Sequence, residues 1–283
     1  MTPDNVKAAR DLLDFYLEAG ADALMGEEPV NRFADTSKPP PERGRSASEA
    51  RRVGVDDKAA DPARSALRTD RPPLSGEGKN LIAPEAAAMA AREAAKSARS
   101  LEELRAILDT FDGCALKATA TQLVFADGNP KARVMFVGEA PGRDEDIEGL
   151  PFVGRSGKLL DRMLAAIGLD RTKVYIANIV PWRPPGNRTP TPQESQICLP
   201  FILRQIELAN PDILVCLGGP SAQALLGIKD GITKTRGRWF SFDTGSREIR
   251  ALATFHPAFL LRSPLQKRFA WRDFLAIKKA LAA

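Results

Sequence analysis

The chain contains little histidine, cysteine or aromatic side chain. Of its 283 residues only His256 is a histidine, three are cysteines, and 6% are aromatic. An odd and sparse set of cysteines argues against a disulfide framework and favours a reducing compartment. No apolar run reaches the length of about 18 residues that a membrane-spanning helix needs, and the N-terminus lacks a signal-peptide pattern. We therefore expect a soluble cytoplasmic protein with no membrane partner.

The charge balance is mildly basic. The chain has 41 Lys and Arg against 36 Asp and Glu, which gives a formal net charge of +5. Such a bias suits a polyanionic partner but does not by itself identify one. Apolar residues make up 43% of the chain, enough for a substantial core.

Composition divides the chain into four parts. The first part has apolar residues at helical spacing, which predicts a helix. The second has no aromatic residue and mixes prolines with charges, which predicts a disordered linker. The third reads as two helices, the second of them capped by Ser100. The expected parts are an N-terminal helix (1–33), a linker (34–79), a helical lead-in (80–110) and a compact domain (111–283).

The compact part alternates short apolar runs with helical segments. The four runs are 132–139, 173–180, 212–219 and 250–257. Strands that alternate with helices indicate parallel βαβ units. We expect an α/β fold, a three-layer αβα sandwich with a central, mainly parallel four-stranded sheet and an N-terminal helical or disordered extension. Residues 237–255 could form an edge hairpin.

In folds of this class the functional site lies beyond the carboxyl ends of the strands. The segments that follow the four predicted strands would therefore converge, and His256 directly follows the last strand. The loop after the first strand fits neither a phosphate-binding P-loop nor a dinucleotide fingerprint. It offers carboxylates and the aromatic Phe152, a combination that predicts a pocket able to stack a flat ring and bind its edge.

Three segments in register resemble the family four uracil-DNA glycosylases. They are "GEAPGRDEDIEGLPFVG", "YIANIVPWRPPGNRTPTPQE" and "HPAFLLR", and the resemblance covers roughly residues 111–283. It implies a monofunctional DNA repair glycosylase that hydrolyses the N-glycosidic bond of deoxyuridine, releases uracil and leaves an abasic site for base excision repair. The implied partner is uracil-containing DNA, single- or double-stranded, which would associate the protein with the nucleoid. We expect the protein to be a monomer. Two alternatives stay open: a catalytically weak protein that binds DNA lesions or abasic sites, and an unrelated nucleotide-handling enzyme on the same fold.

The resemblance assigns roles in uracil binding. Phe152 would stack on the flipped base, and Asn178 would read the edge that distinguishes uracil from cytosine. Gly138 and Ala140 would line the same pocket. His256 would donate a hydrogen bond to uracil O2, where negative charge develops as the bond breaks. A neutral imidazole suits that role, because a positive charge would oppose the cationic sugar.

The sequence offers two candidate residues for water activation. Related glycosylases hold the water with an aspartate directly before the proline, but the residue at that position is Ala140. Glu139 and Glu145 are the candidate catalytic substitutes, with Asp146 behind them. The carboxylates at 144–146 could instead be the charge cluster of a helix start.

The same loops would contact DNA. By its place in the motif, Leu260 resembles an apolar wedge that fills the gap left by the flipped base. Arg262 and Arg188 could pair with phosphates, as could the hydroxyl of Ser221.

Family four enzymes typically hold a four-cysteine iron-sulfur cluster, and this chain departs from that pattern. Cys114 and Cys198 occupy two of the ligand positions, whereas Phe111 and Trp182 occupy the other two. Two thiolates cannot supply four ligands. We therefore predict no iron-sulfur cluster, no metal and no other cofactor, with the two aromatic side chains filling the vacated volume.

Overall fold

The structure is a computed structural model that describes residues 84–282. The helix expected over residues 1–33 and the linker expected over 34–79 lie outside the described residues. Within the described part, no helix is both long and apolar enough to cross a membrane.

Residues 84–282 contain one six-stranded sheet in the order β1-β3-β2-β4-β6-β5. The four inner strands run parallel, and β1 and β5 pair antiparallel at the two edges. The expected central, mainly parallel four-stranded sheet corresponds to the four inner strands, whereas the whole sheet has six strands because β1 and β5 extend it at its edges. The edge hairpin exists as β5 and β6. The strands are β1 (Asp127–Gly128), β2 (Val134–Gly138), β3 (Tyr175–Asn178), β4 (Ile213–Leu217), β5 (Trp239–Asp243) and β6 (Glu248–Thr254).

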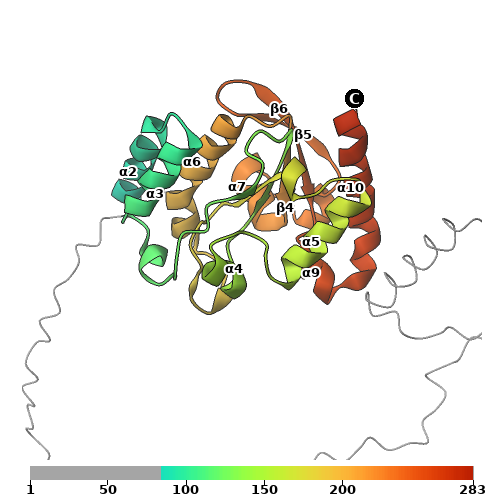
Figure 1. Cartoon of the computed structure of the whole chain (residues 1–283), viewed down its shortest axis with the longest axis horizontal. Helices are drawn as coiled ribbons and strands as arrows, with labels where there is room; N and C mark the ends of the chain where they lie inside the picture. The colour runs from blue at the N-terminus through green and yellow to red at the C-terminus, as the bar shows by residue number, and fades with distance from the viewer. Residues whose placement is uncertain (1–83, 283) are drawn as a thin grey trace, which may run out of the picture. The chain divides into compact units, whose positions relative to one another are not determined.

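Helices cover both faces of the sheet, so the three-layer arrangement is also confirmed (Figure 1). Every residue of β2 and β4 is buried, as expected for inner strands covered on both sides. Side chains alternate between two cores: Met135 and Leu214 pack in one, Phe136 and Val215 in the other. The first core is completed by α2 (Pro84–Ser97), α3 (Leu101–Thr110), α6 (Pro192–Ala209) and α7 (Gly219–Leu226), the second by α5 (Arg155–Ala166) and α10 (Lys267–Ala282).

The two lead-in helices belong to the same hydrophobic core as the sheet. Ala87, Ala91 and Ala95 are spaced four residues apart, so they form one small-residue stripe on α2, and that helix packs against α6. As expected, Ser100 caps α3, and its side chain accepts a hydrogen bond from the backbone N–H of Glu103. The core therefore extends over residues 84–110 as well.

Short elements form the edge of the domain at the carboxyl ends of the parallel strands. Because β2, β3, β4 and β6 all end at this edge, the loops that follow them meet there. The elements found in or beside these loops are α4 (Arg143–Glu148), α8 (Ile232–Thr235), α9 (Pro257–Arg262) and the 3-10 turn η3 (Pro185–Asn187). The other 3-10 turns of the described residues are η1 (Ala115–Ala118), η2 (Arg171–Lys173) and η4 (Pro264–Gln266).

Candidate active site

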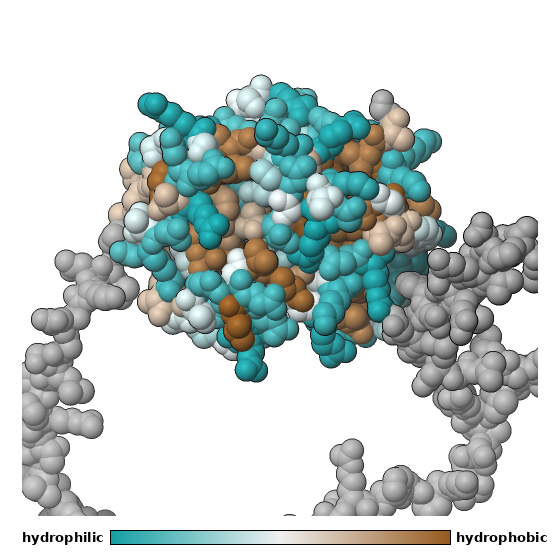
Figure 2. All heavy atoms as spheres, viewed as in Figure 1, coloured by the Kyte–Doolittle hydropathy of each residue, from teal (hydrophilic) through white to brown (hydrophobic). Residues whose placement is uncertain are grey.

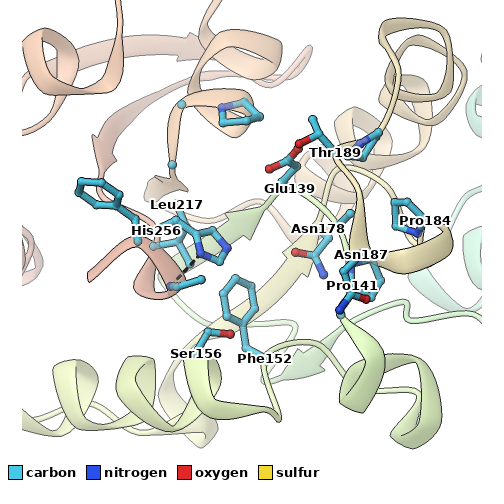
Figure 3. Close-up of a pocket in the computed structure, with 18 of the residues that line it drawn as sticks. Glu139, Pro141, Phe152, Ser156, Asn178, Pro184, Asn187, Thr189, Leu217 and His256 are labelled. Carbon is cyan, nitrogen blue, oxygen red and sulfur yellow. Dashed lines mark hydrogen bonds between the residues drawn. The ribbon is translucent and has the colours of Figure 1, made fainter. Parts of the chain in front are cut away.

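A cavity of about 530 Å³ opens at the carboxyl edge of the sheet. Loops that follow all four parallel strands contribute to its lining, as predicted from the strand order. The side chains of Phe152, Asn178 and His256 line it together, with Glu139 beside them (Figure 3). Ala140 also contributes to the lining. Residues more than 100 positions apart in the chain are thereby brought to one place.

The ring of Phe152 lies against the imidazole of His256. Their ring centroids are 5.4 Å apart and the planes are inclined by 30°. Gly138 makes this arrangement possible, since a β-carbon there would lie 2.6 Å from Cζ of Phe152 and would also collide with Oδ1 of Asn178. Phe152 itself has a left-handed backbone, with φ of 57°, which is unusual for a residue other than glycine.

Asn178 ends β3 and is buried. Its Oδ1 accepts no hydrogen bond from any residue in the described range. Buried polar atoms are nearly always paired, so an unpaired amide oxygen in a cavity indicates a place for a ligand's donor. The amide also carries two N–H donors, which lets one side chain read a donor and an acceptor on the same ring edge.

His256 is the N-terminal cap of α9. Its Nδ1 accepts a hydrogen bond from the backbone N–H of Ala258 at 3.1 Å. Burial, with a smaller contribution from the charge of Arg262, lowers the pKa of His256 to about 4. At neutral pH the ring is therefore uncharged, and the proton lies on Nε2, as a neutral donor requires.

Glu139 follows β2 directly and lines the cavity. Burial raises the pKa of its carboxyl group above the ordinary glutamate value. Its Oε1 is buried and has no hydrogen-bond partner among the described residues. A carboxylate in this state has an oxygen free for water and is a stronger base than an exposed one.

Glu145 lies at the cavity too, but its carboxylate is engaged by the backbone. Oε1 accepts from the N–H of Gly154 at 3.0 Å, and Oε2 accepts from the N–H of Gly142 at 3.1 Å. These bonds join the two ends of the loop that contains α4. The neighbouring Asp146 is similarly engaged, by the backbone N–H and hydroxyl of Thr121. Both contacts favour a loop-fixing role over the water-activating role expected for Glu145.

Two expected DNA contacts require correction. Leu260 is 0% exposed and packs in a small core with Leu159 and Phe255, so it cannot be a surface wedge. The next residue, Leu261, is 38% exposed and borders a surface hollow beside the cavity. Ser221 is also fully buried, and its hydroxyl donates to the carbonyl of Val137 at 2.6 Å, which leaves it unavailable to phosphate.

The two predicted arginines do lie at the cavity. Arg262 and Arg188 both line it. Arg188 also forms two hydrogen bonds with the carboxylate of Glu194, at 2.6 and 2.8 Å, so its guanidinium is partly neutralised. Ile232 also lines the cavity, and it could not be predicted from the sequence because α8 contains no recognisable motif.

The four positions that correspond to cluster ligands lie in or against the core that contains α6. The sulfur atoms of Cys114 and Cys198 are 3.8 Å apart and both thiols are buried. Trp182 is 2% exposed in the same core, and Phe111 meets Phe201 edge-on at 5.0 Å. Two thiols and two aromatic rings do not fit a four-thiolate cluster, and residues 84–282 hold no group of three or more potential metal ligands.

Comparison with known proteins agrees with this geometry. The family model of the Uracil DNA glycosylase superfamily matches residues 125–275. A Type-4 uracil-DNA glycosylase of Archaeoglobus fulgidus is 41% identical over 182 residues, which are 63% of this chain and 92% of the relative. The Type-4 uracil-DNA glycosylase of Thermotoga maritima is 46% identical over 151 residues, which are 53% of this chain and 77% of the relative. That of Sulfurisphaera tokodaii is 40% identical over 185 residues, which are 64% of this chain and 84% of the relative. The chain belongs to the uracil DNA glycosylase superfamily.

Proposed function

We propose that this protein hydrolyses the N-glycosidic bond of deoxyuridine in DNA, releasing uracil and leaving an abasic site. The observation that carries the proposal is the convergence of Phe152, Asn178 and His256 on one cavity. Their chemistry is what a flipped uracil requires: a flat apolar surface, an amide and a neutral N–H donor. Two relatives that are 41% and 46% identical to this chain over the aligned residues are uracil-DNA glycosylases, which supports the same reaction.

Uracil is recognised by its ring face and by one edge. The ring stacks on Phe152, while the unpaired Oδ1 of Asn178 accepts from N3–H and its amide donates to O4. Cytosine presents an acceptor at N3 and a donor at C4, so it would leave the same amide mismatched. A site built to pair buried polar groups rejects such an analogue strongly.

Bond cleavage is assisted from two sides. Nε2–H of His256 donates to uracil O2, and this bond strengthens as negative charge moves onto the leaving base. Glu139 holds and deprotonates the attacking water, and its charge also stabilises the cationic sugar. We assign this role to Glu139 rather than Glu145, because Glu139 has a free buried oxygen whereas both oxygens of Glu145 accept backbone N–H groups.

DNA approaches along the edge that carries α4 and α9. Figure 2 shows apolar side chains exposed among hydrophilic ones at the lower edge of the domain, where Figure 1 places these two helices. Leu261 on α9 fills the space vacated by the flipped base, and Arg262 binds a neighbouring phosphate. We further propose that the protein acts as a monomer, because the described residues of one chain already bring together every side chain that the proposed reaction uses.

The protein works without an iron-sulfur cluster or another cofactor. Phe111 and Trp182 stand where two ligands would be needed, and both pack in or against the apolar core. An apolar plug of this kind replaces a cluster that serves only to join segments of the chain. Iron analysis and a visible absorption spectrum test the proposal: a brown protein with near-stoichiometric iron would overturn it.

The function is tested with a uracil-containing oligonucleotide that is incubated with the protein and then treated with alkali, which cleaves the strand at abasic sites. We expect scission with the native chain and its loss in His256→Ala. Retained DNA binding without scission by the native chain would favour a lesion-binding protein. The absence of both binding and scission would favour an unrelated nucleotide-handling enzyme.

A further inference from the structure

The left-handed backbone conformation of Phe152 requires stabilising contacts. A left-handed conformation is unfavourable for a bulky residue, and it persists only where the surroundings impose it. The ring must nevertheless lie between Gly138 and the imidazole of His256 for the cavity to keep its shape. The contacts that fix this backbone therefore determine the surface on which a base would stack.

One arginine outside the family-like motifs binds both peptide groups that flank the α-carbon of Phe152. Nη1 of Arg171 donates to the carbonyl of Pro151 at 3.2 Å, and Nη2 donates to the carbonyl of Phe152. These carbonyls belong to the peptide units before and after Phe152. Because rotation about φ or ψ of Phe152 would turn one of them away, a single planar guanidinium restrains both angles.

The guanidinium is itself held by two carboxylates from separate elements. Its Nε donates to Asp161 of α5 at 2.8 Å, and Nη1 also donates to Asp127 of β1. The side chain of Arg171 is only 25% exposed and does not line the cavity. Its N–H groups thus already donate to other groups of the protein, which distinguishes Arg171 from an arginine whose donors face solvent and can bind a phosphate.

A second contact also restricts the carbonyl of Phe152. A β-carbon at Gly157, in the first turn of α5, would collide with the carbonyl oxygen and carbon of Phe152. The backbone of α5 therefore lies directly against this carbonyl, and the guanidinium of Arg171 hydrogen-bonds to it. Steric contact and hydrogen bonding together leave this peptide little freedom.

We propose that Arg171 is a positioning residue for base recognition: through the peptides on either side of Phe152 it sets the orientation of the stacking ring without touching the base. The inference rests on the proposed function, in which Phe152 stacks on uracil. It adds a residue in η2 whose effect on substrate comes only through Phe152. Misplacing a contact group by about 1 Å can cost about 100-fold in rate, so the effect is measurable.

The discriminating variant is Arg171→Lys. Lysine keeps the positive charge between Asp127 and Asp161 but cannot present two parallel donors to two carbonyls. We expect kcat/KM on a uracil-containing oligonucleotide to fall by about 10- to 100-fold, and inhibition by free uracil to weaken in parallel. In Arg171→Gln, which loses the charge as well, kcat/KM should fall by at least as much.

A matched control separates positioning from general stability. Arg247 likewise joins backbone carbonyls (Asn210 and Pro211) to a carboxylate, that of Asp212, but at the amino end of β4, opposite the cavity. Arg247→Lys should lower the melting temperature, and it should leave kcat/KM and uracil inhibition unchanged.

A double-mutant cycle with Phe152→Ala completes the test. If Arg171 acts through the ring, Arg171→Lys adds almost nothing once the ring is gone. Native-like uracil inhibition in Arg171→Lys, or a loss that adds in full to that of Phe152→Ala, would overturn the inference. An inactive native chain would instead refute the proposed function, so the two failures are distinguishable.

Discussion

The backbone N–H of Ala258 donates to Nδ1 of His256 at 3.1 Å. This contact decides which ring nitrogen carries the proton in the neutral imidazole, because a nitrogen that accepts a hydrogen bond cannot also bear the hydrogen. Figure 3 shows the other ring nitrogen directed toward the side of the cavity where Asn178 lies. The cap of α9 thereby orients a neutral donor toward the place where a uracil would be bound.

The same histidine should make folding stability depend on pH. Burial first, and then the charge of Arg262, lower the pKa of His256 from 6.5 to about 4 in the folded protein. Between these two values the unfolded chain binds more protons than the folded one, so the free energy of unfolding should decrease as the pH falls from about 6.5 toward 4. Urea denaturation at pH 7 and pH 5 measures this slope.

His256→Gln is the control for that measurement. The chain has no other histidine, so the carboxylates that titrate in the same range are common to both proteins. The variant should show a clearly smaller loss of stability between pH 7 and pH 5. Equal losses in the two proteins would show that His256 keeps an ordinary pKa.

Protonation of Glu139 should cause kcat to decrease at low pH, which is the acid limb of the pH profile. Burial raises the pKa of this carboxyl group, and a base must be deprotonated, so kcat should rise as the pH increases through that raised pKa. Glu139→Gln should lower kcat by about 100- to 10,000-fold with little change in KM, and the acid limb should disappear from its pH profile. A Glu139→Gln variant with native kcat would exclude Glu139 as the base.

Glu145→Gln is the matched comparison within the same loop. Its carboxylate accepts backbone N–H groups from Gly142 and Gly154, and glutamine has only one oxygen to offer them. The variant should lose about 1–3 kcal/mol of stability, measured by urea denaturation, and it should keep the pH limb assigned to Glu139. Loss of that limb in Glu145→Gln would reverse the two assignments.

Much of the fold follows from local pattern. The four buried runs became the four parallel strands because inner strands of a covered sheet are apolar throughout. The position of His256 at the end of the last strand then placed it at the carboxyl edge, where the cavity lies. These features depend on residues that are neighbours in the sequence, and such features can be read from it.

The remaining features depend on contacts between distant segments. Leu260 and Leu261 are adjacent in one short helix, and only the packing of Leu159 and Phe255 decides which of them is buried. The hydroxyl of Ser221, which was expected to bind phosphate, instead donates to the carbonyl of Val137, 84 residues away in the sequence. Arg171 lies in no motif, and its function becomes visible only when Pro151 and Phe152 are seen beside it.

Leu261→Ala should weaken action on duplex DNA more than on single strands. The side chain is 38% exposed beside the cavity, so its removal leaves the core intact but leaves the gap in the base stack unfilled. Leu260→Ala, by contrast, creates a buried cavity and should cost about 2–5 kcal/mol of stability. Comparing kcat/KM on both substrates with the melting temperature separates the two leucines. Equal activity of Leu261→Ala on duplex and single strands would exclude the wedge.

Trp182 should stabilise the domain by apolar packing. The side chain is 2% exposed in the core that also holds Cys114 and Cys198, so Trp182→Ala should cost about 3–5 kcal/mol. Treatment of the native chain with an iron chelator and a reductant should leave the melting temperature unchanged, because metal that is not bound cannot contribute stability. A chelator-induced drop, accompanied by released iron, would mean that the two cysteines recruit further ligands. An unchanged melting temperature together with an unstable Trp182→Ala would assign the stabilising role at this position to apolar packing.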